Sequence, residues 1–158
     1  MIEEVRARLM AEVGELNHEL HVTLPEALQK ARELGDLKEN GDYQAAVERQ
    51  GFVASRLNQL RNRLSKLSQI DLSKIPDDRV GLGSRVTVKD LGTKESEVFE
   101  IVIADAMDFE KGHISVSSPL GRALLDGKVK DTVKVQLPMG KRRLRITSLE
   151  TFHDQLTE

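Results

Sequence analysis

The sequence contains no cysteine and no tryptophan, and aromatic residues make up only 3% of its 158 residues. Without cysteine there can be no disulfide framework, no thiolate metal site and no cysteine nucleophile, which fits a reducing compartment. A compact domain with one large core normally holds more aromatic side chains than this. Long helices that pack along a narrow aliphatic seam need fewer, so the scarcity favours a helical rod for part of the chain.

An excess of charge of one sign is also missing, because 24 basic residues stand against 26 acidic ones, with balance in both halves. This argues against a protein that coats nucleic acid through a generally basic surface, so any such contact must be local. The N-terminus, MIEEVRARLM, lacks the apolar segment of a secretory signal, and no apolar run approaches membrane-spanning length. We therefore expect a cytoplasmic protein without a membrane partner.

Proline and glycine are scarce before residue 70, where apolar residues recur at helical spacing. Segment 42–67 carries a heptad seam with alternating steps of 4 and 3, at Ala46, Gln50, Val53, Leu57, Leu60, Leu64 and Leu67. A second seam precedes it, at Val5, Leu9, Val13, Leu16, Leu20, Leu24, Ala27, Ala31 and Leu34. Because the joining loop is short, the two helices should lie antiparallel.

Pro25 interrupts the first of these helical patterns. Thr23 and Glu26 have the spacing of a capping box, and Pro25 then lies in the first turn, where its missing N–H costs little. The pattern predicts a kink or a restart of the helix near residue 23.

The chain changes character at the linker 71–83, DLSKIPDDRVGLG. Beyond it, short β-branched runs alternate with glycine-containing turns, which predicts strands at 84–89, 98–103, 113–117, 132–137 and 142–148. Ser118 and Pro119 have the residue types of a helix cap and first position, which predicts a short helix through Leu125. We expect an α+β protein, with an antiparallel coiled-coil hairpin at 1–75 and a small, mostly antiparallel β-sheet domain with one short helix at 76–158.

The bend between the two helical segments, residues 35–43, is unusually acidic. Gly35 is typical of a residue that ends a helix, and Asp42 of one that caps the next helix. Asp36 and Glu39 are three residues apart, so in a helical turn they would share one face. They fit two interpretations: ordinary caps, or a carboxylate pair that completes a Mg²⁺ site whose other ligands belong to a partner.

The stretch ARELGDLKENGDYQAAVERQGF, residues 31–52, resembles the tip signature of the GreA/GreB family of bacterial transcript cleavage factors. VGLGSRVTV, GHISVSSPLGRALL and VKVQLPMGKRRLRITSLE resemble the C-terminal domain of that family in order and spacing. The resemblance covers nearly the whole chain. It implies a coiled coil followed by an FKBP-like domain that docks on RNA polymerase.

The resemblance also implies a function. The coiled coil would enter the secondary channel of RNA polymerase and stimulate the intrinsic cleavage of backtracked RNA by the polymerase at the RNA 3′ end. Asp36 and Glu39 would be the catalytic pair, holding a Mg²⁺ shared with the polymerase active site and bound only in the complex. Asn40, Asp42 and Tyr43 would support the tip. The chain would be an accessory factor and a monomer, with no cofactor of its own and no enzymatic turnover.

Three further sets of residues keep two interpretations each. Tyr43 could contact the polymerase or transcript, or pack in the seam. Arg49, Arg56 and Arg63, seven residues apart, could lie beside RNA or pair with the heptad-spaced glutamates that include Glu12 and Glu19. The segment with Ser118, Pro119, Leu120 and Arg122 could dock on the polymerase or close the sheet.

Two other functions remain open from the sequence. The chain could be a regulator that binds the secondary channel without stimulating cleavage, although the intact Asp36 and Glu39 pair disfavours this. It could also be an FKBP-like prolyl isomerase with a helical arm. The latter is weakened because the second half has only Phe99, Phe109 and Phe152 for an aromatic-lined pocket.

Overall fold

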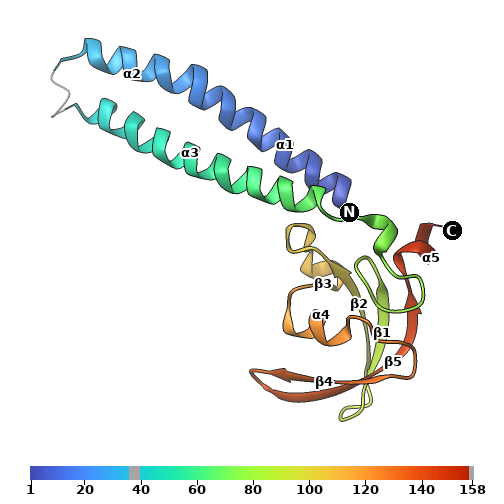
Figure 1. Ribbon diagram of the computed structural model, residues 1–158. Helices are drawn as coiled ribbons and strands as arrows, with labels where there is room; N and C mark the ends of the chain where they lie inside the picture. The colour runs from blue at the N-terminus through green and yellow to red at the C-terminus, as the bar shows by residue number, and fades with distance from the viewer. Residues whose placement is uncertain (36–39, 157–158) are drawn as a thin grey trace. The chain divides into compact units, whose positions relative to one another are not determined.

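The computed structural model describes residues 1–35 and 40–156 (Figure 1). The chain divides into two compact units. Residues 2–70 form a helical hairpin, and the residues from 71 onward form a unit built on a β-sheet. None of the described helices is long and apolar enough to cross a membrane.

The hairpin consists of α1 (Ile2–His18), a π-helical turn (Glu19–Thr23), α2 (Leu24–Glu33) and α3 (Gly41–Ser68). In Figure 1, α3 runs back alongside α2 and α1, as the short connection predicted. The seam predicted for α3 is confirmed, because its apolar positions are buried at Ala46, Val53, Leu57, Leu60 and Leu67. Gln50 and Leu64 are half-buried members of the same stripe.

The first helical segment departs from its predicted seam after residue 24. Ala27 and Leu34 are exposed, and the half-buried Leu28 takes the place that the sequence assigned to Ala27. The cause is the π-helical turn, in which the N–H of Leu24 reaches back to the carbonyl of Glu19. A π-helical turn holds about one residue more than an α-helical turn. Leucines that are four residues apart therefore stay on the seam.

The predicted capping box at Thr23 is wrong. Thr23 has helical angles, φ −65° and ψ −48°, and its side chain caps nothing. In a regular α-helix the ring of Pro25 would clash with the carbonyl four residues earlier, and Pro25 has no N–H to donate. The chain accommodates Pro25 through the wider turn instead of a new start, so the helix continues.

The second unit contains each of the predicted strands, as β1 (Arg85–Asp90), β2 (Ser96–Val102), β3 (His113–Ser115), β4 (Thr132–Leu137) and β5 (Gly140–Glu150). Their order in the sheet is β3-β2-β1-β5-β4, and only β2 and β3 run parallel. The short helix is α4 (Pro119–Leu124). A second short helix, α5 (Phe152–Leu156), follows β5, and single 3₁₀ turns occur at Leu72–Lys74, Ala104–Ala106 and Phe109–Lys111.

One face of the sheet forms the core of this unit. Alternation along β1 buries Val86 and Val88 and exposes Arg85 and Lys89. The fully buried side chains that gather there include Val86, Val88, Ile101, Leu124, Leu144 and Ile146. The β1–β5 register shifts between Thr87 and Val88, which leaves Thr147 as an extra residue on β5. The observed fold class is therefore the predicted one, a helical hairpin followed by a mostly antiparallel sheet with a short helix.

Candidate functional site

The acidic bend is framed by the ends of α2 and α3. The helix α2 ends at Glu33, and Gly35 follows with φ 130°, a backbone conformation that favours glycine. The predicted stop at Gly35 is confirmed. Asp36 and Glu39, the predicted catalytic and metal-binding pair, lie outside the described residues.

Asn40 joins the two helices at the base of the bend. Its Oδ1 accepts a hydrogen bond from the backbone N–H of Tyr43 at 3.1 Å, which caps α3. Its Nδ2 donates to the carbonyl oxygen of Ala31 in α2 at 2.5 Å. One side chain therefore pairs with an N–H group at the start of α3 and with a carbonyl oxygen near the end of α2.

The prediction that Asp42 caps α3 is wrong. Asn40 has the extended backbone of a cap residue, with φ −85° and ψ 101°, whereas Asp42 already lies inside the first turn of the helix. In that position the charge of Asp42 interacts favourably with the positive end of the helix dipole. Asp42 therefore adds negative charge at the base of the bend without shaping it.

Tyr43 lies between the helices near the bend. The guanidinium carbon of Arg32, on α2, is 5.9 Å from the centroid of the Tyr43 ring, which is a cation–π distance. The ring is half-buried and helps to line a small pocket of about 260 Å³ with Gln44, Val47 and Glu48. The structure thus gives Tyr43 a partner within the hairpin and leaves part of its ring accessible.

Two of the heptad-spaced arginines pair with glutamates of the opposite helix. Arg49 donates two hydrogen bonds to Glu19, at 2.6 and 2.9 Å, and Arg56 donates two to Glu12, at 2.8 and 3.2 Å. These bonds hold the pKa of Glu19 and of Glu12 below the usual value for a glutamate. The interhelical interpretation is confirmed for Arg49 and Arg56, while contact with RNA stays a prediction.

The segment proposed for docking divides into buried and exposed residues. Ser118 caps α4, because its Oγ accepts from the N–H of Gly121 at 3.0 Å and donates to the carbonyl of Ser115 at 2.7 Å. Leu120 packs against the core of the sheet. Pro119 and Arg122 are exposed, with the Nε of Arg122 donating to the carbonyl of Ser117 at 2.8 Å. The two interpretations therefore fall on different residues of one segment.

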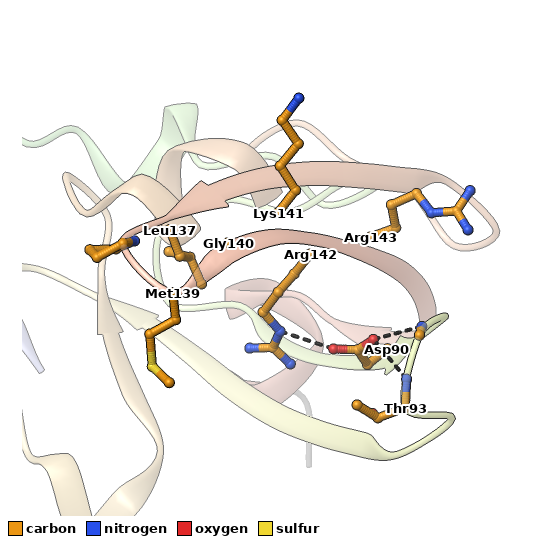
Figure 2. Close-up of a pocket in the computed structure, with 10 residues that line it drawn as sticks. Asp90, Thr93, Leu137, Met139, Gly140, Lys141, Arg142 and Arg143 are labelled. Atoms are coloured by element: carbon orange, nitrogen blue, oxygen red, sulfur yellow. Dashed lines mark hydrogen bonds and ion pairs between the residues drawn. The ribbon is translucent and has the colours of Figure 1, made fainter.

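A charged cluster that sequence patterns did not predict lines a pocket of about 820 Å³ beside the β4–β5 turn (Figure 2). Buried Asp90 accepts hydrogen bonds from the N–H groups of Gly92 and Thr93 and from Arg142 at 3.0 Å. Arg142 also donates to Glu97 at 2.7 Å. The N–H of Gly92, followed by Arg142, lowers the pKa of Asp90.

The pocket is bounded by apolar side chains of the β4–β5 turn, namely Leu137, Pro138 and Met139. The described residues that line it include no aromatic side chain. Phe109 is 87% exposed, and Phe99 packs against the sheet core. This pocket does not support the prolyl isomerase interpretation, which requires an aromatic-lined site.

Comparison with known proteins matches both units. Residues 1–68 match the family description "Transcription elongation factor, N-terminal", and residues 75–151 match "Transcription elongation factor, GreA/GreB, C-term". The transcription elongation factor GreA of Rhodospirillum rubrum is 39% identical over 89% of this chain and 90% of its own length. GreA of Pelobacter propionicus is 38% identical over 86% of this chain and 88% of its own length.

A solved structure, GreA factor homolog 1 (Gfh1) of Thermus thermophilus, is 25% identical over 92% of this chain and 94% of its own. Its TM-score is 0.42. The family descriptions and the GreA relatives span both the helical hairpin and the sheet unit. The chain belongs to the GreA/GreB family of transcription elongation factors.

Proposed function

We propose that this chain is an accessory factor that binds RNA polymerase, inserts the hairpin into the secondary channel and stimulates the intrinsic cleavage of backtracked RNA by the polymerase. The observation that carries the proposal is the motif GDLKEN, residues 35–40, located between the end of α2 and the cap of α3 in a member of this family. Its two carboxylates belong to the segment that connects the two helices of the hairpin.

The length of the hairpin suits an arm that would reach into a channel. The helix α3 has 28 residues, which corresponds to a rod about 42 Å long. Arg49 and Arg56 tie the two sides of the rod together through Glu19 and Glu12, and Asn40 joins them next to the bend. A rod held at several points along its length can present its tip in a defined position.

Asp36 and Glu39 have the donor chemistry that Mg²⁺ prefers. This ion binds oxygen ligands in an octahedral arrangement and commonly takes only one or two carboxylates. Two carboxylates from the tip would complete a site whose other ligands come from the polymerase, and the bound ion would activate water toward a phosphodiester. The role of the chain is to hold these two carboxylates, with Asn40 fixing the start of α3 beside them.

Two other groups would assist. Arg49 and Arg56 would place positive charge near the phosphates of the RNA 3′ segment, while their glutamate partners keep them oriented. Pro119 and Arg122, the exposed members of the α4 segment, would contact the polymerase. The chain would perform no turnover by itself.

The test uses stalled, backtracked elongation complexes. We expect the wild-type chain to shorten the RNA from its 3′ end only when polymerase and Mg²⁺ are present. Asp36→Asn and Glu39→Gln keep the size of each side chain and remove its charge, so each should abolish cleavage. Binding to the polymerase, measured in parallel, should stay close to that of the wild type.

Glu48→Gln is the matched control, since Glu48 is an exposed carboxylate on the first part of α3. It removes one negative charge from the same arm and should leave cleavage intact. Normal cleavage by the Asp36→Asn and Glu39→Gln double variant would contradict the assignment of the tip. A wild-type chain that binds polymerase and never stimulates cleavage would instead be a secondary-channel regulator.

A further inference from the structure

A second charged feature lies on the sheet unit, on the face opposite its core. Alternation along the strands directs one set of side chains outward from β1, β4 and β5. Besides Arg85, which pairs with Glu150, this set contains five exposed cations, which we call the outer basic face: Lys89, Lys134, Lys141, Arg143 and Arg145. Figure 2 shows Lys141 leaving β5 on the side opposite to Arg142 and Asp90.

The cations of the outer basic face oppose one another across the strands. Lys134 of β4 is the register partner of Arg143, and Lys89 of β1 is the register partner of Arg145. Directly opposite residues of an antiparallel pair lie close together, and like charges there destabilise the sheet. The fold therefore tolerates two unfavourable pairs on one surface.

The acids that share this surface lie at one end of it, where Glu100 and Glu150 are the register partners of Arg85. Within the described part of the chain, none of the five cations forms an ion pair or a side-chain hydrogen bond. The neighbouring outward positions hold neutral polar residues, Thr87, Thr132 and Gln136. The next residue along β5, Arg142, points to the other face and is paired with both Asp90 and Glu97. The protein carries more acids than bases, yet none of the five cations has an acid as its register partner in the sheet.

Protection of the sheet edge accounts for only one of these residues. Lysine on an edge strand discourages pairing with another chain, and β4 is an edge strand that carries Lys134. Arg143 and Arg145 belong to β5, which is paired on both sides by β1 and β4. A binding role explains the whole set, whereas edge protection does not.

The arrangement fits a regular polyanion. Same-face residues of a strand are about 6.6–6.8 Å apart, so Lys141, Arg143 and Arg145 form a row about 13 Å long. Lys134 and Lys89 flank this row on both sides. No residue of β1, β4 or β5 is aromatic, so the face offers no platform on which unpaired bases could stack. Phosphates are then the groups it can contact, and a double helix presents them at the highest density.

We propose that the outer basic face binds the phosphate backbone of double-helical DNA, without sequence preference. This function goes beyond the proposed cleavage role, since it uses a different unit and needs neither Asp36 nor Glu39. The overall negative charge of the chain confines such binding to one face.

The test measures binding of the full-length chain to a short fluorescent DNA duplex by anisotropy. If all five cations contact phosphates, the slope of log affinity against log salt should be about −4.5, so a fourfold rise in salt weakens binding about 500-fold. Lys89→Glu combined with Lys134→Glu leaves three cations on the face. We expect that double variant to bind at least about tenfold more weakly and with a slope of about −2.7.

The same double variant also tests whether the fold survives. Each substitution changes a like-charge pair into an opposite-charge pair, so the melting temperature should be equal or higher. The matched control is Lys66→Glu with Lys74→Glu, which changes the net charge equally at exposed positions outside the face. This control should bind the duplex much like the wild type.

Three results would overturn the proposal. One is an equal loss of duplex binding in both double variants, which would reflect net charge alone. Another is tighter binding of a single strand than of the duplex. The third is displacement of the duplex by polyglutamate at a lower charge concentration than unlabelled duplex requires, which would assign the face to an acidic protein.

Discussion

Arginines of the hairpin and arginines of the outer basic face have different surroundings. In the hairpin, Arg49 and Arg56 each bond to a glutamate of the other helix. In the sheet, Arg143 and Arg145 lie opposite lysines of neighbouring strands. The hairpin therefore uses these two arginines internally, to keep two helices in register, while the outer basic face leaves Arg143 and Arg145 available to a partner. The two halves of the chain have a similar balance of acidic and basic residues, so the difference is visible only in which residues lie next to each arginine.

Truncation should cost more in the buried core of the sheet unit than at the open end of the hairpin. Leu144 is fully buried among the core residues, and Leu144→Ala should lower the free energy of unfolding by about 2–5 kcal/mol. Leu34, at the open end of α2, is 73% exposed, and Leu34→Ala should change it by less than about 0.5 kcal/mol. Urea denaturation followed by circular dichroism measures both, and similar losses would show that the seam extends to Leu34.

Glycines in the two units should respond to alanine with opposite signs. A Cβ on Gly121 would overlap the carbonyl oxygen of Ser115, so Gly121→Ala should destabilise the sheet unit by about 1–3 kcal/mol. A Cβ on Gly51 would meet open space within α3. Gly51→Ala should therefore stabilise the hairpin by roughly 0.5–1 kcal/mol. Melting curves of the two variants give the signs, and a neutral Gly121→Ala would contradict the close approach of α4 to β3.

Asn40 offers a smaller and more local test of the hairpin. Asn40→Ala removes the cap of α3 and the bond to Ala31, which should cost about 1 kcal/mol. Asn40→Asp keeps an oxygen for the N–H of Tyr43 and loses only the donor toward Ala31. The aspartate variant should therefore be the more stable of the two in thermal unfolding. Equal costs would indicate that capping contributes nothing beyond the bond to α2.

Much of this framework could be predicted from sequence, since it depends on local pattern. Val53, Leu57 and Leu60 follow a heptad, and Ser118 with Pro119 has the residue types that start a helix. The helix α5 also had a usable signal, because the Thr151 and Asp154 side chains each bond to the N–H of the other, as in a capping box.

The remainder depends on contacts between distant residues. Asn40 and Asp42 are equally good cap residues. Asn40 is the one that caps α3, and it also bonds to Ala31 across the hairpin, a contact that no local pattern reveals. Asp90 and Arg142 are separated by 52 positions in the sequence. Asp36 and Glu39 lie outside the described residues, so their role rests on the motif and the family.

Replacing one cation of the sheet with an acid should create an opposite-charge pair like those of the hairpin. Lys134→Glu places a carboxylate opposite Arg143, and we expect the free energy of unfolding to rise by roughly 0.2–1 kcal/mol. Lys66→Glu, at an exposed position of α3, serves as the charge-matched control. A loss of stability in Lys134→Glu alone would mean that the like-charge pairing is relieved in some other way.

The smallest expected effect is that of acid on the two arginine–glutamate pairs of the hairpin. The pKa values of Glu12 and Glu19 are lowered in the folded state by their arginine partners. Their contribution is therefore complete above the unfolded value of 4.5 and is lost as the pH falls through the lower folded pKa. The melting temperature of a Glu12→Gln and Glu19→Gln variant should fall less steeply below pH 4.5 than that of the wild type. Identical slopes would show that these exposed pairs add nothing measurable.

The π-helical turn at Glu19–Thr23 has a consequence for the direction in which the arm presents its end. Each residue of an α-helix advances the chain by about 100° around the axis. The π-helical turn is wider, so its five residues sweep nearly the same angle as four residues of an α-helix. Deleting a single residue from it would make the helix regular and leave the residues beyond it facing nearly the same way. The turn therefore lets the arm hold one more residue between its two halves without turning its far end around the axis.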